Sequence, residues 1–259
     1  MHPAQGEIIL LIWLYMSLLF LIALWKRDNS IADVGWGLGF VLIAWWLHFF
    51  HPYPGSGLTA TLVSLWGLRL SGHISWRKTR QTGEDWRYAR WRQQWGQWFL
   101  LRSYAQVFLL QGFFMWVIAL PLAQGPEQQA WPWAQALGIT LWAVGFCWEA
   151  VADWQLLRFK SKPENRGKLM MQGLWRYSRH PNYFGEIVLW WGLWLSLLPH
   201  TYFWLSLASP LVVAWLLARV SGVPLLEEKY RGNTEYEAYQ RDTPALFPRW
   251  RSTARKLEQ

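Results

Sequence analysis

Residues 8–25 read IILLIWLYMSLLFLIALW, eighteen consecutive residues without a charged side chain. About 20 apolar residues in a helix span the hydrocarbon core of a bilayer. The run lacks the alternation of polar and apolar residues that marks a membrane β-strand. Because a backbone in lipid must satisfy its own hydrogen bonds, the stretch predicts a transmembrane α-helix. Neither a basic region nor a small-residue cleavage site precedes it, so we expect it to be retained and not removed as a signal peptide.

Six further apolar runs follow, and together they predict an all-α, polytopic integral membrane helical bundle of about seven transmembrane helices. The expected spans are residues 8–25, 34–50, 58–74, 99–122, 133–157, 183–198 and 202–220. Tryptophan accounts for 24 of the 259 residues and recurs at span ends, as interfacial aromatic belts do. We find neither an internal repeat nor a low-complexity linker, so residues 1–259 are expected to form one transmembrane domain.

Basic residues gather on alternate connections between the spans. Of the 25 Lys and Arg residues, 23 lie within residues 26–27, 77–102, 158–179 and 229–256, whereas residues 51–57, 123–132 and 199–200 contain none. Cytoplasmic loops carry such an excess, which predicts an outside N-terminus and a cytosolic C-terminus. The formal net charge of +9 therefore follows from topology. We expect no nucleic-acid partner, because no recognised binding motif accompanies the charge.

Two pairs of polar residues near the cytosolic ends of spans are spaced i, i+4 and so share a helical face: Glu149 with Asp153, and Asn182 with Glu186. Exposing carboxylates to lipid costs several kcal/mol, so the first pair should face the protein interior or a wet cavity. A cavity for a ligand and a structural ion pair with Arg158 or Lys160 are both compatible with this spacing.

The stretch GLWRYSRHPNYFGE, residues 173–186, combines cations with a helix start. Pro181 suits the first turn of a helix, and Arg179 and His180 come directly before it, with Arg176 close by. A helix N-terminus beside cations is a natural site for an anion such as a phosphate. The alternative is that these cations only follow the charge bias of cytosolic loops. Gly185 would let a ligand or another backbone approach closely.

The segment RHPNYFGE at residues 179–186, preceded by GLWRY, resembles the signature of steroid 5α-reductases, sterol reductases and isoprenylcysteine carboxyl methyltransferases. DWQLLRFK at residues 153–160 and the tail YEAY…TPALFP at residues 236–248 are similar to the reductases in particular. The resemblance covers residues 145–250 and implies a cofactor-binding part there. Bacterial relatives of this kind imply a multi-pass protein of the bacterial cytoplasmic membrane.

The resemblance implies an NADPH site open to the cytosol. The residues expected to contact the cofactor are Asp153, Lys160, Lys168, Arg179, His180, Asn182, Glu186 and Tyr239. The two lysines fall where the reductases carry phosphate-binding arginines, and Tyr239 matches a tyrosine of their tail, although an interfacial aromatic is the plain alternative. The chain departs from the animal enzymes at Glu149, where they have asparagine, and near Glu227 and Glu228, where they have histidine.

The proton donor of the family is a Glu and Tyr pair in the N-terminal half, and this chain has no clear copy of it. Asp33 at the entry to the second span is our first candidate and Tyr88 in the basic loop is the second. Asp33 could instead cap a helix. Arg69 lies in the third span, where a charge needs a partner. We therefore expect Asp33 to pair with Arg69, which would hold the acid ionised and pass the donor role to a group such as Tyr88.

These features predict an NADPH-dependent oxidoreductase that reduces a C=C bond of a lipophilic enone, a small molecule that enters from the membrane lipids. Hydride would go to the β-carbon while a protein acid polarises the carbonyl oxygen. An S-adenosylmethionine-dependent membrane methyltransferase is the main alternative, because it shares the signature at residues 179–185. A transporter or scaffold ranks third, since we find no paired broken spans. We expect no metal, and the sequence predicts neither the substrate nor the oligomeric state.

Overall fold

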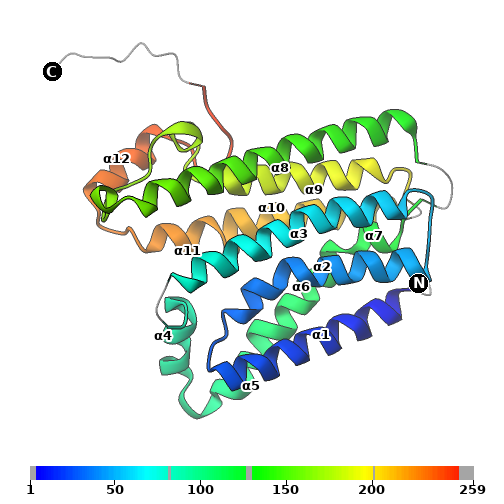
Figure 1. Ribbon diagram of the computed structural model, residues 1–259, viewed down its shortest axis with the longest axis horizontal. Coiled ribbons are helices and arrows are strands. Elements are labelled where there is room, and N and C mark those ends of the chain that lie inside the picture. Colours follow the sequence, from blue (N-terminus) through cyan, green and yellow to red (C-terminus); the bar gives the residue numbers. More distant parts are fainter. Residues whose placement is uncertain (1–3, 81–82, 127–129, 201, 251–259) are drawn as a thin grey trace. The chain divides into compact units, whose positions relative to one another are not determined.

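The computed structural model describes residues 4–80, 83–126, 130–200 and 202–250, and every regular element in these ranges is helical (Figure 1). The chain forms two compact units. Unit 1 comprises residues 1–132 and 197–209, and unit 2 comprises residues 133–196 and 210–259. The expectation of one domain stays a prediction.

Unit 1 begins with three long helices that cover the first three predicted spans: α1 (Ala4–Lys26), α2 (Ile31–Phe50) and α3 (Ser56–Thr79). Each is slightly longer than the corresponding apolar run. Leu14, Leu18 and Leu21 on α1 are all more than half exposed. A helix that leaves so many large apolar side chains uncovered is adapted to contact lipid. The short helix α4 (Trp86–Trp95) then forms within the basic connection.

The fourth predicted span, residues 99–122, is helical but not continuous. It consists of α5 (Phe99–Ser103), the π-helical turn η2 (Tyr104–Leu109), α6 (Leu110–Ile118) and α7 (Leu120–Ala123), and the 3-10 turn η1 (Gly96–Trp98) precedes it. Pro121 stands in the first turn of α7, where its missing N–H is tolerated. Proline inside a continuous helix would clash with the preceding turn, so a new helix begins here.

Unit 2 contains most of α8 (Pro132–Ser161), the whole of α9 (Pro181–Ser196) and several shorter elements. The others are η3 (Pro163–Asn165), η4 (Gly173–Arg176), the second half of α10 (Phe203–Trp215), the π-helical turn η5 (Leu216–Val220), α11 (Val223–Glu228) and α12 (Thr234–Asp242). Asn233 caps α12, because its side chain accepts a hydrogen bond from the backbone N–H of Tyr236 at 2.9 Å.

The chain after α12 lies along the segment that precedes α9. The backbone N–H groups of Arg179 and His180 donate to the carbonyls of Pro244 and Ala245 at 2.9 and 3.0 Å. In return, the N–H of Arg249 donates to the carbonyl of Tyr177 at 3.0 Å. Residues 243–250 therefore form a strap that is fastened to residues 177–180 by backbone hydrogen bonds.

Four helical segments among the described residues are long and apolar enough to cross a membrane: α1, α2, α8 and the segment Phe203–Glu228 that begins with α10. The other three predicted spans are helical as well. Of these, α3 is more polar, residues 99–122 are interrupted, and α9 has 16 residues. Together the helices define a polytopic helical membrane protein.

Glycine brings pairs of antiparallel helices into close backbone contact in both units. A Cβ added to Gly37 of α2 would lie 2.4 Å from the carbonyl oxygen of Gly67 of α3. In unit 2, α8 and α9 run side by side (Figure 1), and two such contacts recur one heptad apart: Gly138 opposite Gly192, and Gly145 opposite Gly185. Small residues let membrane helices approach closely enough for dispersion contacts between backbones.

Candidate functional site

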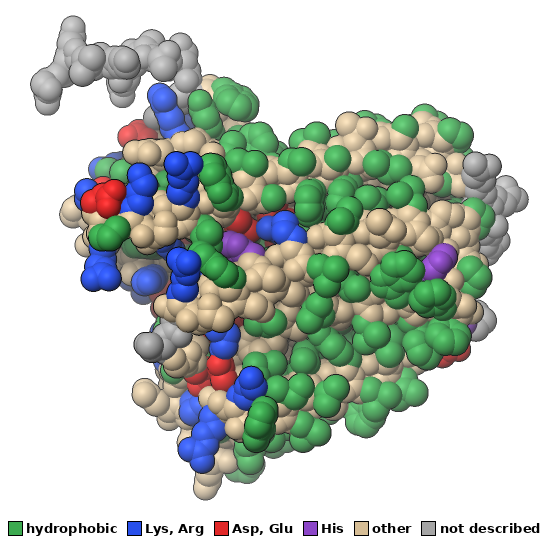
Figure 2. Space-filling view, in the orientation of Figure 1, with side chains coloured by type: hydrophobic (Ala, Val, Ile, Leu, Met, Phe, Trp, Pro, Cys, Tyr) green, Lys and Arg blue, Asp and Glu red, His purple; other side chains and the backbone are tan. Residues whose placement is uncertain are grey.

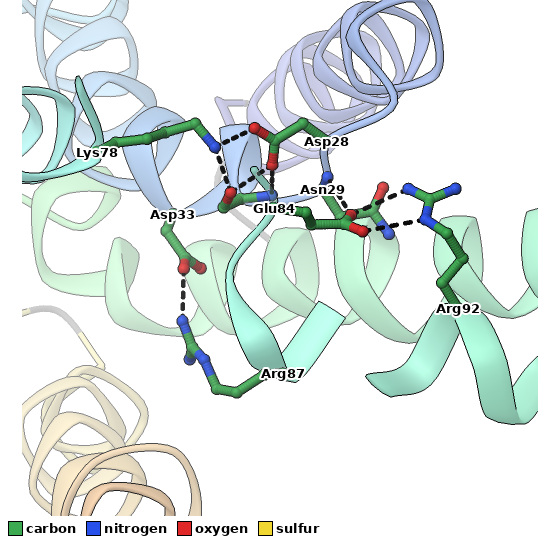
Figure 3. Close-up of polar contacts among 8 residues, drawn as sticks. Asp28, Asn29, Asp33, Lys78, Glu84, Arg87 and Arg92 are labelled. Carbon is green, nitrogen blue, oxygen red and sulfur yellow. Dashed lines mark hydrogen bonds and ion pairs between the residues drawn. The ribbon is translucent and has the colours of Figure 1, made fainter. Parts of the chain in front are cut away.

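Asp33 lies in the first turn of α2 and accepts two hydrogen bonds from side chains of α4. The phenol of Tyr88 donates to Oδ1 at 2.7 Å. Nη2 of Arg87 donates to Oδ2 at 2.8 Å and forms an ion pair (Figure 3). Tyr88 is only 3% exposed, whereas about a fifth of each of the two charged side chains is accessible. The two residues that the sequence singled out as acids are thus in direct contact.

Arg87 is held in place by a residue of its own helix terminus. Asp85 is the N-cap of α4, and its Oδ1 accepts hydrogen bonds from the backbone N–H of Arg87 at 3.0 Å and from its Nε at 2.9 Å. A capping carboxylate is stabilised by the helix N-terminus. Asp85, Arg87 and Asp33 therefore form a chain of alternating charge that ends on the hydroxyl of Tyr88.

The segment that carries α4 is attached to the turn between α1 and α2 (Figure 3). Oε1 of Glu84 accepts a hydrogen bond from the backbone N–H of Asn29 at 2.8 Å. The guanidinium of Arg92 donates to both carboxylate oxygens of Glu84, each at 3.0 Å. The side chain of Asn29 also donates to Ser103 of α5 at 2.7 Å. The segment that carries α4 and the helix α5 are thereby both bound to the turn between α1 and α2.

Lys78 at the end of α3 completes this network through an ion pair with Asp28 and a hydrogen bond to Ser30 (Figure 3). Partial burial of Asp28 opposes its ionisation, but the hydrogen bonds from Lys78 and Ser30 outweigh burial and hold the pKa of Asp28 below its ordinary value. Its carboxylate is therefore charged at neutral pH.

The structure corrects two expectations about Asp33. Its ion-pair partner is Arg87, not Arg69 as the sequence suggested, because α4 folds back over the start of α2. The residue at the cap position of α2 is Ser30, so Asp33 is not the cap. Arg87 stands next to Tyr88 in the sequence, and its place in that acidic and aromatic segment was the only signal that could have identified it.

Burial, followed by the charge of Asp33, raises the pKa of Tyr88 well above its ordinary value. The phenol therefore keeps its proton at neutral pH and acts as a hydrogen-bond donor. Arg87 gains charge stabilisation from Asp33 and Asp85 that outweighs its own burial, and its pKa is raised. The arrangement is a neutral O–H held by a carboxylate whose charge a guanidinium balances.

In unit 2, Asp153 of α8 and Asn182 of α9 are in contact. Nδ2 of Asn182 donates to Oδ1 of Asp153 at 3.2 Å, and Asp153 is 6% exposed. The close approach of Gly145 and Gly185 brings these two helices together at this level. Gly185 thus serves the approach of a backbone, which was one of its two expected roles. Oδ1 of Asn182 is buried and accepts no hydrogen bond from any described residue.

Arg179 and His180 both contact Glu227 of α11. Nε of Arg179 donates to Oε1 of Glu227 at 2.9 Å, and Nε2 of His180 lies 3.0 Å from the same oxygen. Nε2 of Gln240 donates to Oε2 at 2.7 Å, and Arg179 also donates to the carbonyl of Thr243. The charge of Arg179 is thus matched by a carboxylate of unit 2. Glu227 lies 48 residues from Arg179, so no local pattern could have revealed this contact.

The remaining residues predicted to contact the cofactor differ in their exposure. Lys160 and Lys168 lie on the surface, and Glu186 is half-buried on α9. Tyr239 is buried, and its hydroxyl donates to the carbonyl of Trp175, which rules out the alternative of an interfacial aromatic. An open cavity of about 420 Å³ lies between α11 and α12, and Glu227 and Gln240 of the Arg179 cluster line it together with Tyr236.

The fold and these sites define the chain as a polytopic helical membrane protein with clusters of polar side chains near the ends of its helices. Residues 19–243 match the model of a family described as a protein of unknown function (DUF1295), and the chain belongs to that family. It is 27% identical over 282 residues to an uncharacterized protein of Schizosaccharomyces pombe. The aligned region covers 93% of this chain and 78% of the relative. No solved structure matches the chain.

Proposed function

We propose that this protein is an NADPH-dependent membrane reductase that saturates the C=C bond of a lipophilic enone. The observation that carries the proposal is the Asp33–Tyr88 pair with its Arg87 partner. A carboxylate–phenol pair in the N-terminal half is what the resemblance to steroid 5α-reductases requires and what the sequence alone did not reveal.

Tyr88 is the proposed acid. It has a single O–H, which here donates to Asp33, and which would turn to the carbonyl oxygen of a bound enone. A donor at that oxygen stabilises the negative charge that develops there in the transition state. Asp33 would orient the phenol through this hydrogen bond. Arg87, whose guanidinium carbon lies 5.3 Å from the centroid of the Tyr88 ring, would offset the negative charge that develops as the proton moves. Asp33 is therefore the positioning residue in this proposal.

Unit 2 would hold the cofactor, which supplies a hydride when bound. The buried Oδ1 of Asn182, which accepts no hydrogen bond within the described part of the chain, suits an amide or hydroxyl donor of NADPH. The carboxylate of Asp153 would accept a hydrogen bond from a second donor of NADPH. Glu186, a further proposed contact, lies one turn beyond Asn182 on α9. Lys160 and Lys168 are the proposed phosphate contacts. Tyr239 would support the site by holding the backbone before α9.

The proposal includes the topology. All seven predicted segments would cross the bilayer, with the N-terminus outside and the C-terminus in the cytosol, in the cytoplasmic membrane of a bacterium. The cofactor-binding side would then carry the basic connections, in agreement with the charge bias. The substrate would enter laterally from the lipid.

A methyltransferase that uses S-adenosylmethionine is the second candidate, and one observation favours it. Arg179 and His180 are engaged by Glu227, which leaves less positive charge for a pyrophosphate than the sequence suggested. S-adenosylmethionine carries no phosphate, so it does not need those cations.

Thermal unfolding of the detergent-solubilised protein separates the two candidates. A ligand at 100 times its Kd stabilises the native state by about 2.7 kcal/mol. NADPH should raise the Tm and S-adenosylmethionine should not; the reverse result would favour the methyltransferase. Asp153→Ala and Asn182→Ala should each abolish most of the NADPH shift. Lys160→Ala or Lys168→Ala should weaken NADPH more than NADH, whereas the exposed neighbour Lys162→Ala should affect neither.

A further inference from the structure

The end of unit 1 that carries α4 has a surplus of exposed positive charge. Its four acids each contact a cation: Asp28 contacts Lys78, Asp33 and Asp85 contact Arg87, and Glu84 contacts Arg92. Residues 77–102 nevertheless contain seven Lys and Arg. Figure 2 shows basic side chains gathered around α4. The surplus lies on the surface, at exposed residues that include Arg77, Arg80 and Arg102.

Exposed tryptophans accompany these arginines. Trp76, Trp86 and Trp98 are 37%, 42% and 56% exposed. The guanidinium carbon of Arg80 lies 3.7 Å from the ring centroid of Trp76, which is a cation–π geometry. Trp25 at the end of α1 is 80% exposed. Tryptophan is enriched where a membrane protein meets the headgroup layer, because its ring is apolar and its N–H is polar.

The position of this surface along the helices identifies its partner. α1 is long enough to span the bilayer and ends at Lys26, and Asn29 just after it is bonded to the segment that carries α4. The basic and aromatic surface therefore lies where a membrane-spanning helix leaves the hydrocarbon core. A cation at that level meets lipid phosphates, and a tryptophan meets the headgroup boundary.

We propose that this end of unit 1 is a binding surface for anionic phospholipid, with Arg77, Arg80 and Arg102 contacting headgroup phosphates and Trp76, Trp86 and Trp98 lying in the headgroup layer. A lipid accounts for both kinds of side chain, whereas a soluble acidic partner would leave three tryptophans exposed to water. The inference does not depend on the enzymatic proposal, since it concerns the charge and the aromatic residues of one surface.

The test is native mass spectrometry of the full chain in a neutral detergent, titrated with phosphatidylglycerol or with phosphatidylcholine of the same acyl chains. A basic residue near an anionic surface contributes roughly fivefold in affinity. We expect phosphatidylglycerol to bind at least about tenfold more tightly than phosphatidylcholine. The triple variant Arg77→Gln, Arg80→Gln, Arg102→Gln should lose this preference.

A matched variant removes the same charge from exposed residues of unit 2: Lys162→Gln, Arg166→Gln, Arg176→Gln. It should keep the preference. Equal binding of the two lipids by the native protein, or equal loss in both variants, would overturn the proposal. Competition by millimolar inorganic phosphate would indicate a site for a free anion instead. Displacement of the lipid by a poly-aspartate peptide would indicate an acidic protein partner. If the triple variant does not fold, the lipid comparison on native protein and the single Arg80→Gln variant still decide the matter.

Discussion

Each unit packs a pair of helices through glycine and places an acid beside that contact, yet the two acids have different partners. Asp33 on α2 contacts the guanidinium of Arg87 and the phenol of Tyr88. Asp153 on α8 accepts a hydrogen bond from the neutral amide of Asn182. A carboxylate whose charge is balanced by a guanidinium can hold a proton donor in place. An amide whose oxygen accepts no hydrogen bond from the described residues can recognise a ligand. The same type of residue is thus suited to two tasks by its neighbours.

The largest effect should come from breaking the helix pairs. Gly145→Ala would bring a Cβ to 2.5 Å from backbone atoms of Gly185 and Leu189, which cannot move aside as a side chain can. We expect the free energy of unfolding in detergent to fall by about 3 kcal/mol. Gly67→Ala in unit 1 should cost a similar amount. Gly72→Ala, on the open face of α3, should be neutral or stabilising. If Gly145→Ala left the stability unchanged, the close approach of α8 and α9 at Gly145 would not be needed for the stability of unit 2.

The second effect concerns the chemistry of unit 1. Tyr88→Phe removes the proposed donor, and turnover of lipophilic enones, followed as NADPH oxidation, should fall at least 100-fold. The Kd for NADPH should not change. Tyr15→Phe makes the same change on α1, where the hydroxyl donates to the backbone carbonyl of Gly35 at 2.7 Å. It should cost about 1 kcal/mol of stability and leave turnover largely intact. Equal turnover in both variants would remove Tyr88 from the mechanism.

A smaller effect should follow from the contacts of Glu227 in unit 2. Glu227→Gln removes the charge that Arg179 and His180 contact. We expect the free energy of unfolding to fall by about 2 kcal/mol. The strap should loosen, so the backbone amides of Arg179 and Arg249 should exchange their hydrogens faster. Glu235→Gln, on the exposed face of α12, is the control. Unchanged exchange at both amides would show that Glu227 does not hold the strap.

The smallest effect is a pH dependence in unit 1. Because the pKa of Asp28 is lowered by folding, its ion pair with Lys78 stabilises the native state above the ordinary pKa of 3.8 and is lost as pH falls through the lowered value. The contribution should be about 1 kcal/mol or less, since both groups are partly exposed. Asp28→Asn should therefore lower stability at neutral pH and flatten its decline below about pH 4. An unchanged acid profile in the variant would contradict this assignment.

The helices of this protein could be predicted from the sequence because their cause is local and strong. A backbone in lipid has no water to bond, so an uncharged apolar run of spanning length must form its hydrogen bonds within itself. All seven runs are helical, and the one that is broken, residues 99–122, contains Pro121 near its end. Asp33, Asp153 and Asn182 could also be selected as candidates, since polar groups near the ends of apolar helices are few.

What the sequence could not determine was which of these groups touch. Arg87 lies 54 residues from Asp33, and Glu227 lies 48 residues from Arg179. Contacts of that kind depend on how loops and short helices fold back over the ends of the long helices. A charge in water or at a headgroup has several possible partners of similar energy, so local composition does not choose among them. Arg69 was the expected partner of Asp33 because both lie at spans. In the tertiary structure the partner is Arg87, because the capped start of α4 places its guanidinium 2.8 Å from the carboxylate of Asp33.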